Sequence, residues 1–112
     1  MMNARPPLAA IFGCAGAKLT PDEFSFLREA DPLGFIIFAR NITTPDATRA
    51  LVASFREAVG RADAPVLIDQ EGGRVARLRP PHWRKAPPAR IFSDRAAVRG
   101  QDAAIAAVRT NF

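Results

Sequence analysis

The residues best suited to chemistry lie in one short segment, residues 69–77, with the sequence DQEGGRVAR. Its carboxylates, Asp69 and Glu71, can accept hydrogen bonds from hydroxyl groups. Its arginines, Arg74 and Arg77, offer forked donors for carboxylates or for several hydroxyls. Two adjacent glycines between these groups let the backbone turn sharply or approach a ligand closely. The segment is therefore a candidate binding loop for a polar ligand.

Residue types and spacing alone leave several interpretations of this segment open. It lacks the patterns of a phosphate-binding loop and of a dinucleotide-binding turn. Asp69 and Glu71 could ligate a divalent metal, but no further carboxylate or histidine lies nearby in the sequence to complete the site. A pair of carboxylates is also typical of glycosidases. In the structural interpretation, Glu71 and an arginine form an ion pair that holds the loop.

Residues outside this segment could also contribute to a site. Arg40 and Asn41 follow an apolar run and could support a binding site. In the structural alternative, Arg40 pairs with Glu71 or binds carbonyl oxygens at a strand end. Trp83, the only tryptophan, lies in a proline-rich stretch and could stack on a sugar or pack the loop. Cys14 has no base beside it in sequence, so we expect a small buried residue rather than a nucleophile.

The elements that would position this segment alternate between strands and helices. Short apolar runs predict buried strands, and Thr-Pro pairs predict helix starts. The predicted elements are a strand at 8–12, a helix at 21–31, a strand at 34–39, a helix at 45–60 and a strand at 65–68. The third strand would deliver Asp69 at its carboxyl end, which is where parallel α/β folds place ligand sites.

The rest of the chain departs from this alternation. Four prolines between Gly72 and about Ser93 predict a long stiff loop without a helix, and a last helix is expected from about Asp94 to Val108. The order of elements predicts a parallel α/β fold in which the middle strand is covered by helices on both faces. Three strands cannot close a barrel of eight βα units, so we expect the chain to be part of a larger fold.

Composition excludes several classes of protein. With 112 residues, 48% hydrophobic and 24% charged, the chain has the profile of a soluble globular domain. No apolar run reaches the roughly 18–20 residues of a membrane-spanning helix. One cysteine and one histidine exclude an internal disulfide and a structural zinc site. The net charge of +5, concentrated after residue 73, leaves nucleic-acid binding open as an alternative.

Three stretches, in the same order, resemble the N-terminal part of a bacterial β-N-acetylhexosaminidase of glycoside hydrolase family 3. They are residues 11–20, 34–42 and 68–75, and the last, IDQEGGRV, is the most specific. The resemblance covers roughly residues 8–92. It implies an α/β fold of the (β/α)8 TIM-barrel type, of which residues 1–112 would form about three βα units, a partial catalytic-barrel domain.

The resemblance also implies roles for individual residues. Asp69 would hydrogen-bond hydroxyls of the sugar at the non-reducing end, and Arg77, eight positions later, would contact the substrate as well. Glu71, Arg74 and Arg40 are candidates for supporting these two side chains.

Catalysis is expected to come from residues beyond Phe112. The resemblance implies a downstream aspartate as nucleophile and a downstream histidine as acid/base, so no residue of this chain, His82 included, is expected to be catalytic. The implied activity of the parent protein is the retaining removal of terminal N-acetylglucosamine from peptidoglycan muropeptides in cell-wall recycling, without metal or organic cofactor. The 112-residue chain alone is expected to be inactive.

The expected setting is the cytoplasm, because the N-terminal apolar stretch is shorter than an export signal needs. The expected partner is a carbohydrate, with no nucleic acid, membrane or obligate protein partner. Three alternatives remain: a β-glucosidase within the family, a non-catalytic sugar-binding module that oligomerises through open sheet edges, and a basic nucleic-acid-binding domain.

Overall fold

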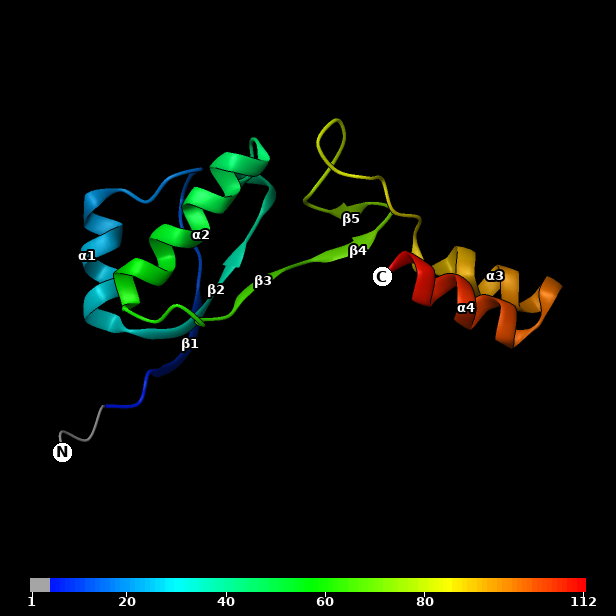
Figure 1. The fold of residues 1–112 in the computed structure, drawn as a ribbon, viewed down its shortest axis with the longest axis horizontal. Coiled ribbons are helices and arrows are strands. Elements are labelled where there is room, and N and C mark those ends of the chain that lie inside the picture. The colour runs from blue at the N-terminus through cyan, green and yellow to red at the C-terminus, as the bar shows by residue number, and fades with distance from the viewer. Residues whose placement is uncertain (1–4) are drawn as a thin grey trace. The chain divides into compact units, whose positions relative to one another are not determined.

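The computed structural model describes residues 5–112, which divide into two compact units between Ile68 and Asp69 (Figure 1). The N-terminal unit is a mixed α/β structure, and its three strands form a parallel sheet in the order β1-β2-β3. Its elements are β1 (Leu8–Phe12), α1 (Pro21–Ala30), β2 (Pro32–Ile37), the 3-10 turn η1 (Ala39–Asn41), α2 (Pro45–Val59) and β3 (Val66–Ile68).

The helices of this unit begin and end where local chemistry predicts. At the start of α1, the Glu23 backbone N–H donates to Thr20 Oγ1 at 3.1 Å, and the Thr20 N–H donates to Glu23 Oε1 at 2.9 Å. At the start of α2, Thr44 Oγ1 accepts from the Ala47 N–H at 3.2 Å. Left-handed residues end both helices, Asp31 with φ of 47° and Gly60 with φ of 67°.

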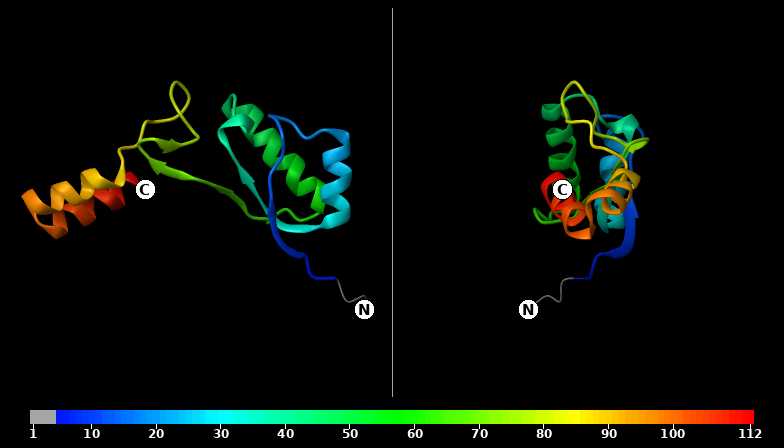
Figure 2. Two further views of the ribbon diagram at one scale, coloured as in Figure 1. Left: turned by 180° about the vertical axis from the view of Figure 1, so that it is seen from behind. Right: turned by 90° about the vertical axis from the view of Figure 1, so that its right-hand side faces the viewer.

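The core of the N-terminal unit lies on one face of the sheet. Phe35 of β2 stacks on Phe55 of α2 with ring centroids 4.0 Å apart, and neither side chain is exposed. Helices α1 and α2 lie side by side (Figures 1 and 2), and buried Leu27 of α1 joins the same cluster. The expectation that β2 is covered on both faces is wrong for residues 5–68. On the opposite face, Ile11 remains 40% exposed and Leu67 45% exposed.

Strand β2 also begins and ends two residues earlier than predicted. Its early end has a local reason, because Asn41 Oδ1 accepts a hydrogen bond from the Phe38 N–H at 2.9 Å. The Phe38 N–H is therefore not available for hydrogen bonding within the sheet. The apolar run therefore continues into η1 rather than into a longer strand.

The C-terminal unit, Asp69–Phe112, contains a short antiparallel hairpin and a pair of helices. These elements are β4 (Gln70–Gly72), β5 (Val75–Ala76), α3 (Ala89–Arg99) and α4 (Gln101–Asn111). Helices α3 and α4 pack against each other, as Figure 1 shows. Among residues 5–112, no helix combines the length and the apolar character that crossing a bilayer requires.

Two predictions for this part of the chain are wrong. The stretch predicted as a loop without a helix contains the start of α3, which begins directly after Pro88. The single helix predicted near residues 94–108 is two helices, because Gly100 adopts φ of 88° and ψ of 162°. That backbone conformation is open to glycine and costly for residues with a Cβ, so the helix is interrupted there.

Candidate functional site

Segment 69–77 is built as the β4–β5 hairpin with a tight glycine turn. Gly72 and Gly73 adopt φ of 88° and 59°, values that side-chain-bearing residues rarely take. A Cβ on Gly72 would lie 2.1 Å from the backbone oxygen of Pro87. The two glycines therefore allow the later proline-rich loop to pack directly on the turn.

Gln70 closes the other end of this hairpin. Its Oε1 accepts from the backbone N–H groups of Arg77 at 2.9 Å and Leu78 at 3.0 Å. Its Nε2 donates to the backbone oxygen of Leu78 at 2.9 Å. A single side-chain amide thus fixes the backbone that carries Arg77. Sequence reasoning missed this role, because only the partners, seven and eight residues later, reveal it.

The structure brings together Asp69 and Arg77, the two residues expected to contact substrate. Arg77 Nη2 lies 3.7 Å from Asp69 Oδ2, which is an ion-pair distance but longer than a hydrogen bond. The Asp69 side chain is 50% exposed and that of Arg77 is 24% exposed. Arg77 Nε is buried and has no hydrogen-bond partner within the described residues. The half-exposed carboxylate of Asp69 and the Nη groups of Arg77 therefore keep hydrogen-bonding capacity that a ligand could use.

The supporting residues are placed differently. Glu71 and Arg74 are exposed, and neither forms an ion pair among the described residues of the C-terminal unit. The interpretation that a Glu71–arginine pair holds the loop is therefore wrong for that unit. In the N-terminal unit, Arg40 Nε donates to the backbone oxygen of Cys14 at 3.1 Å, and its guanidinium lies 4.9 Å from the Phe38 ring centre. This agrees with the structural role in which Arg40 binds a carbonyl beyond a strand end.

The remaining candidates offer no reactive group. Cys14 is buried, as expected, and burial followed by the charge of Glu23 raises the pKa of its thiol above the ordinary value of 9.0. Such a thiol stays protonated at neutral pH and is a poor nucleophile. Trp83 is partly exposed and meets the exposed His82 edge to face, with ring centres 5.7 Å apart. Among residues 5–112, no group of three or more His, Cys, Asp or Glu side chains is arranged to hold a metal ion.

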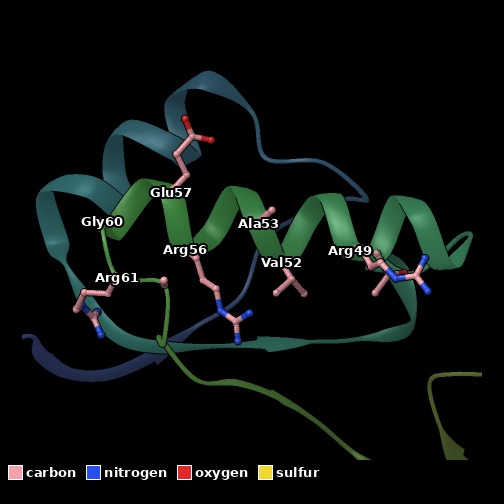
Figure 3. Close-up of a pocket in the computed structure, with 9 residues that line it drawn as sticks. Arg49, Val52, Ala53, Arg56, Glu57, Gly60 and Arg61 are labelled. Atoms are coloured by element: carbon pink, nitrogen blue, oxygen red, sulfur yellow. The ribbon is translucent and has the colours of Figure 1, made fainter.

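A cavity of about 810 Å³ runs along α2 in the N-terminal unit and contains none of the predicted site residues (Figure 3). The arginines that line it are already engaged. Arg49 pairs with Asp46 at 2.7 Å, and Arg56 Nε donates to the backbone oxygen of Ala64 at 3.1 Å. Arg61 donates to the backbone oxygen of Leu33 at 3.2 Å. The groove is an open surface of the helix rather than a chemical site.

Comparison with known proteins gives consistent relatives, although no family model matches the chain. A curated β-hexosaminidase from Methylococcus capsulatus is 38% identical over 94 residues, which are 84% of this chain and 27% of that protein. The crystal structure of NagZ from Neisseria gonorrhoeae in complex with N-trifluoroacetyl-D-glucosamine has a TM-score of 0.80 and 25% identity, covering 88% of this chain and 29% of NagZ.

A second solved structure names the family. It is a glycoside hydrolase family 3 β-N-acetylglucosaminidase from Paenibacillus sp., with a TM-score of 0.62 and 27% identity over 73% of this chain and 16% of that protein. The chain thus spans less than a third of the length of each of these relatives. Sequence and fold together confirm the resemblance that the three sequence stretches indicate.

Proposed function

We propose that this chain, a homologue of part of the glycoside hydrolase family 3 β-N-acetylglucosaminidases, forms a sugar-binding wall of an exo-acting β-N-acetylhexosaminidase. The observation that carries the proposal is the Asp69–Arg77 pair, held by Gln70 directly after the third parallel strand. The reaction would be the removal of terminal N-acetylglucosamine, in the cytoplasm and from cell-wall muropeptides.

The N-terminal unit supports placing this wall in a (β/α)8 barrel. Its strands are parallel and adjacent in sequence order, and both helices contribute to the core on one face. In a barrel, helices cover the outer face and apolar side chains fill the interior. Ile11 and Leu67, exposed on the opposite face, would belong to that interior filling.

The pair would act by positioning the sugar rather than by breaking a bond. The half-exposed carboxylate of Asp69 can accept hydrogen bonds from two hydroxyls, and Arg77 can donate from its Nη groups, which make no hydrogen bond among the described residues. Holding the ring in fixed geometry lowers the barrier for groups supplied by the rest of the protein. A retaining mechanism also needs a nucleophile and an acid/base, which the proposal assigns to residues outside this chain.

Sugar binding by the chain itself tests the proposal. We expect N-acetylglucosamine to shift the backbone amide NMR signals of Gln70 and Arg77 saturably, and Asp69→Asn to weaken that binding about tenfold. Asp102→Asn removes one negative charge from α4 and serves as the matched control. Absence of saturable shifts, or equal affinity in Asp69→Asn and in the control, would refute the role of the pair.

A further inference from the structure

We propose that the C-terminal unit carries a second binding site, for an oxyanion, between the β4–β5 hairpin and the loop that follows it. A cavity of about 560 Å³ lies there, within the range of small-ligand pockets. Three cationic side chains, Arg74, Arg79 and Lys85, line it together with three apolar ones, Ala76, Leu78 and Pro80.

The cations around this cavity form no ion pair with the described carboxylates of the unit. No acidic side chain lines it. Of the acids in the described C-terminal unit, Asp69 pairs with Arg77 at 3.7 Å and Asp94 pairs with Arg90 at 3.8 Å. The three cavity cations form no ion pair among the described residues. Like charges around one cavity repel, and a bound anion relieves that repulsion while accepting charge-assisted hydrogen bonds.

Hydrogen bonds to the backbone fix the walls of this cavity. Arg79 Nε donates to the backbone oxygen of Ala76 at 2.7 Å, which fixes the guanidinium while its Nη groups make no hydrogen bond within the described residues. On the other side, the Gly73 N–H donates to the backbone oxygen of Ala86, beside Lys85, at 3.1 Å. The hairpin and the loop are therefore joined by a backbone hydrogen bond beside the cavity, which reduces the ordering needed on binding.

The lining indicates the class of ligand. Arginine forks suit the planar oxygens of a carboxylate and those of a phosphate equally well. The apolar side chains of Ala76, Leu78 and Pro80 add a surface for an organic body that carries the anion. The site does not rest on the proposed glycosidase function, because neither Asp69 nor Arg77 lines the cavity.

Titration of the 112-residue chain tests this site. Inorganic phosphate and citrate are added in separate experiments, and the amide NMR signals of Gly73 and Leu78 are followed. We expect saturable shifts that weaken with added salt, and about tenfold lower affinity in Lys85→Gln. Lys85 makes no hydrogen bond or ion pair among the described residues, so this variant is expected to keep the fold. Arg99→Gln, which removes one positive charge at the end of α3, is the matched control.

Each result decides the proposal. Binding of phosphate alone assigns the site to phosphorylated ligands, binding of citrate alone assigns it to organic carboxylates, and binding of both assigns it to oxyanions in general. Shifts that do not saturate, or equal weakening in Lys85→Gln and Arg99→Gln, overturn the site and leave only the diffuse attraction of a basic domain.

Discussion

The side-chain amide of Asn41 donates hydrogen bonds to the backbone oxygen and Sγ of Cys14, at 3.1 and 3.3 Å, across 27 residues of sequence. It also donates to the backbone oxygen of Gly16 at 2.8 Å. Asn41 is 1% exposed, and its Oδ1 is used by the Phe38 N–H. One buried side chain thus binds the segment after β1 to the turn after β2, near the carboxyl edge of the parallel sheet.

Replacing Asn41 is therefore expected to destabilise the N-terminal unit strongly. Asn41→Ala leaves the Phe38 N–H and the Gly16 oxygen without this partner, and an unsatisfied buried group costs about 1–3 kcal/mol. We expect a loss of about 3 kcal/mol in the free energy of unfolding, measured by urea denaturation. Thr43→Ala, two residues along on the exposed surface, is the control. A loss below about 0.5 kcal/mol, the size of an ordinary surface substitution, would contradict this role.

The stability contribution of Glu23 is expected to depend on pH. Backbone N–H groups of Thr20 and Ala15, each 2.9 Å away, hold the pKa of this carboxyl below its ordinary value of 4.5. A lowered folded-state pKa stabilises the protein above the unfolded value, and the contribution is lost as pH falls through the folded value. Glu23→Gln should therefore lower the stability by about 0.5 kcal/mol at neutral pH, a figure reduced for solvent screening.

The pH series provides the check on that assignment. The difference between wild type and Glu23→Gln in the free energy of unfolding should shrink as the pH falls below 4.5. Glu29→Gln, on the same helix, removes a carboxylate that makes no hydrogen bond or ion pair among the described residues. A difference for Glu23→Gln that persists unchanged into acid would show that shape, rather than charge, is responsible.

Gly72 and Gly100 form a matched pair for testing whether the proline-rich loop packs against the turn at Gly72. Both have φ of 88°, but a Cβ on Gly72 would meet the Pro87 oxygen at 2.1 Å, whereas a Cβ on Gly100 would meet no atom within 4 Å. Alanine strains the backbone at both positions. We expect Gly72→Ala alone to remove the hydrogen-exchange protection of the Gly73 amide, which donates to Ala86. Equal protection in the two variants would mean that the loop adjusts to the added methyl group.

The chain alone is expected to show no glycosidase activity. Asp69 and Arg77 can hold a sugar, but the proposed nucleophile and acid/base lie outside residues 1–112. The measurement is the release of 4-nitrophenol from 4-nitrophenyl N-acetyl-β-D-glucosaminide by the purified chain. Release above the buffer rate that disappears in Asp69→Asn would contradict the assignment of catalysis to other residues.

Local signals account for the parts of the fold that the sequence predicts well. Thr20, Thr44 and Gly60 act through hydrogen bonds and dihedral angles within a few residues, so the ends of α1 and α2 are visible in the sequence. Gly100 carries a similar signal, but the alanine-rich stretches on both sides favour one continuous helix. That prediction fails because backbone conformation at a single residue outweighs the propensity of its neighbours.

In the candidate site, too, some residue roles are visible in the sequence and others appear only in the structure. Asp69 and Arg77 could be named from a motif, and the structure brings them together. The role of Gln70 depends on a hairpin whose strands are three and two residues long, too short for any periodicity to appear. The partner of Arg40 lies 26 residues away in sequence, a distance that residue types cannot reveal.

Within the N-terminal unit, Ile11 and Leu67 leave an apolar face of the sheet exposed, which favours self-association of the chain in concentrated solution. The sheet of the N-terminal unit ends at β1 and β3, whose outer backbone groups are the kind that another molecule's strand can pair with. We therefore expect aggregation of the purified chain to increase with protein concentration. A single lysine at Leu67 places a charge on that face while leaving the packing of Phe35 on Phe55 intact, and offers a direct route to a sample that stays monodisperse.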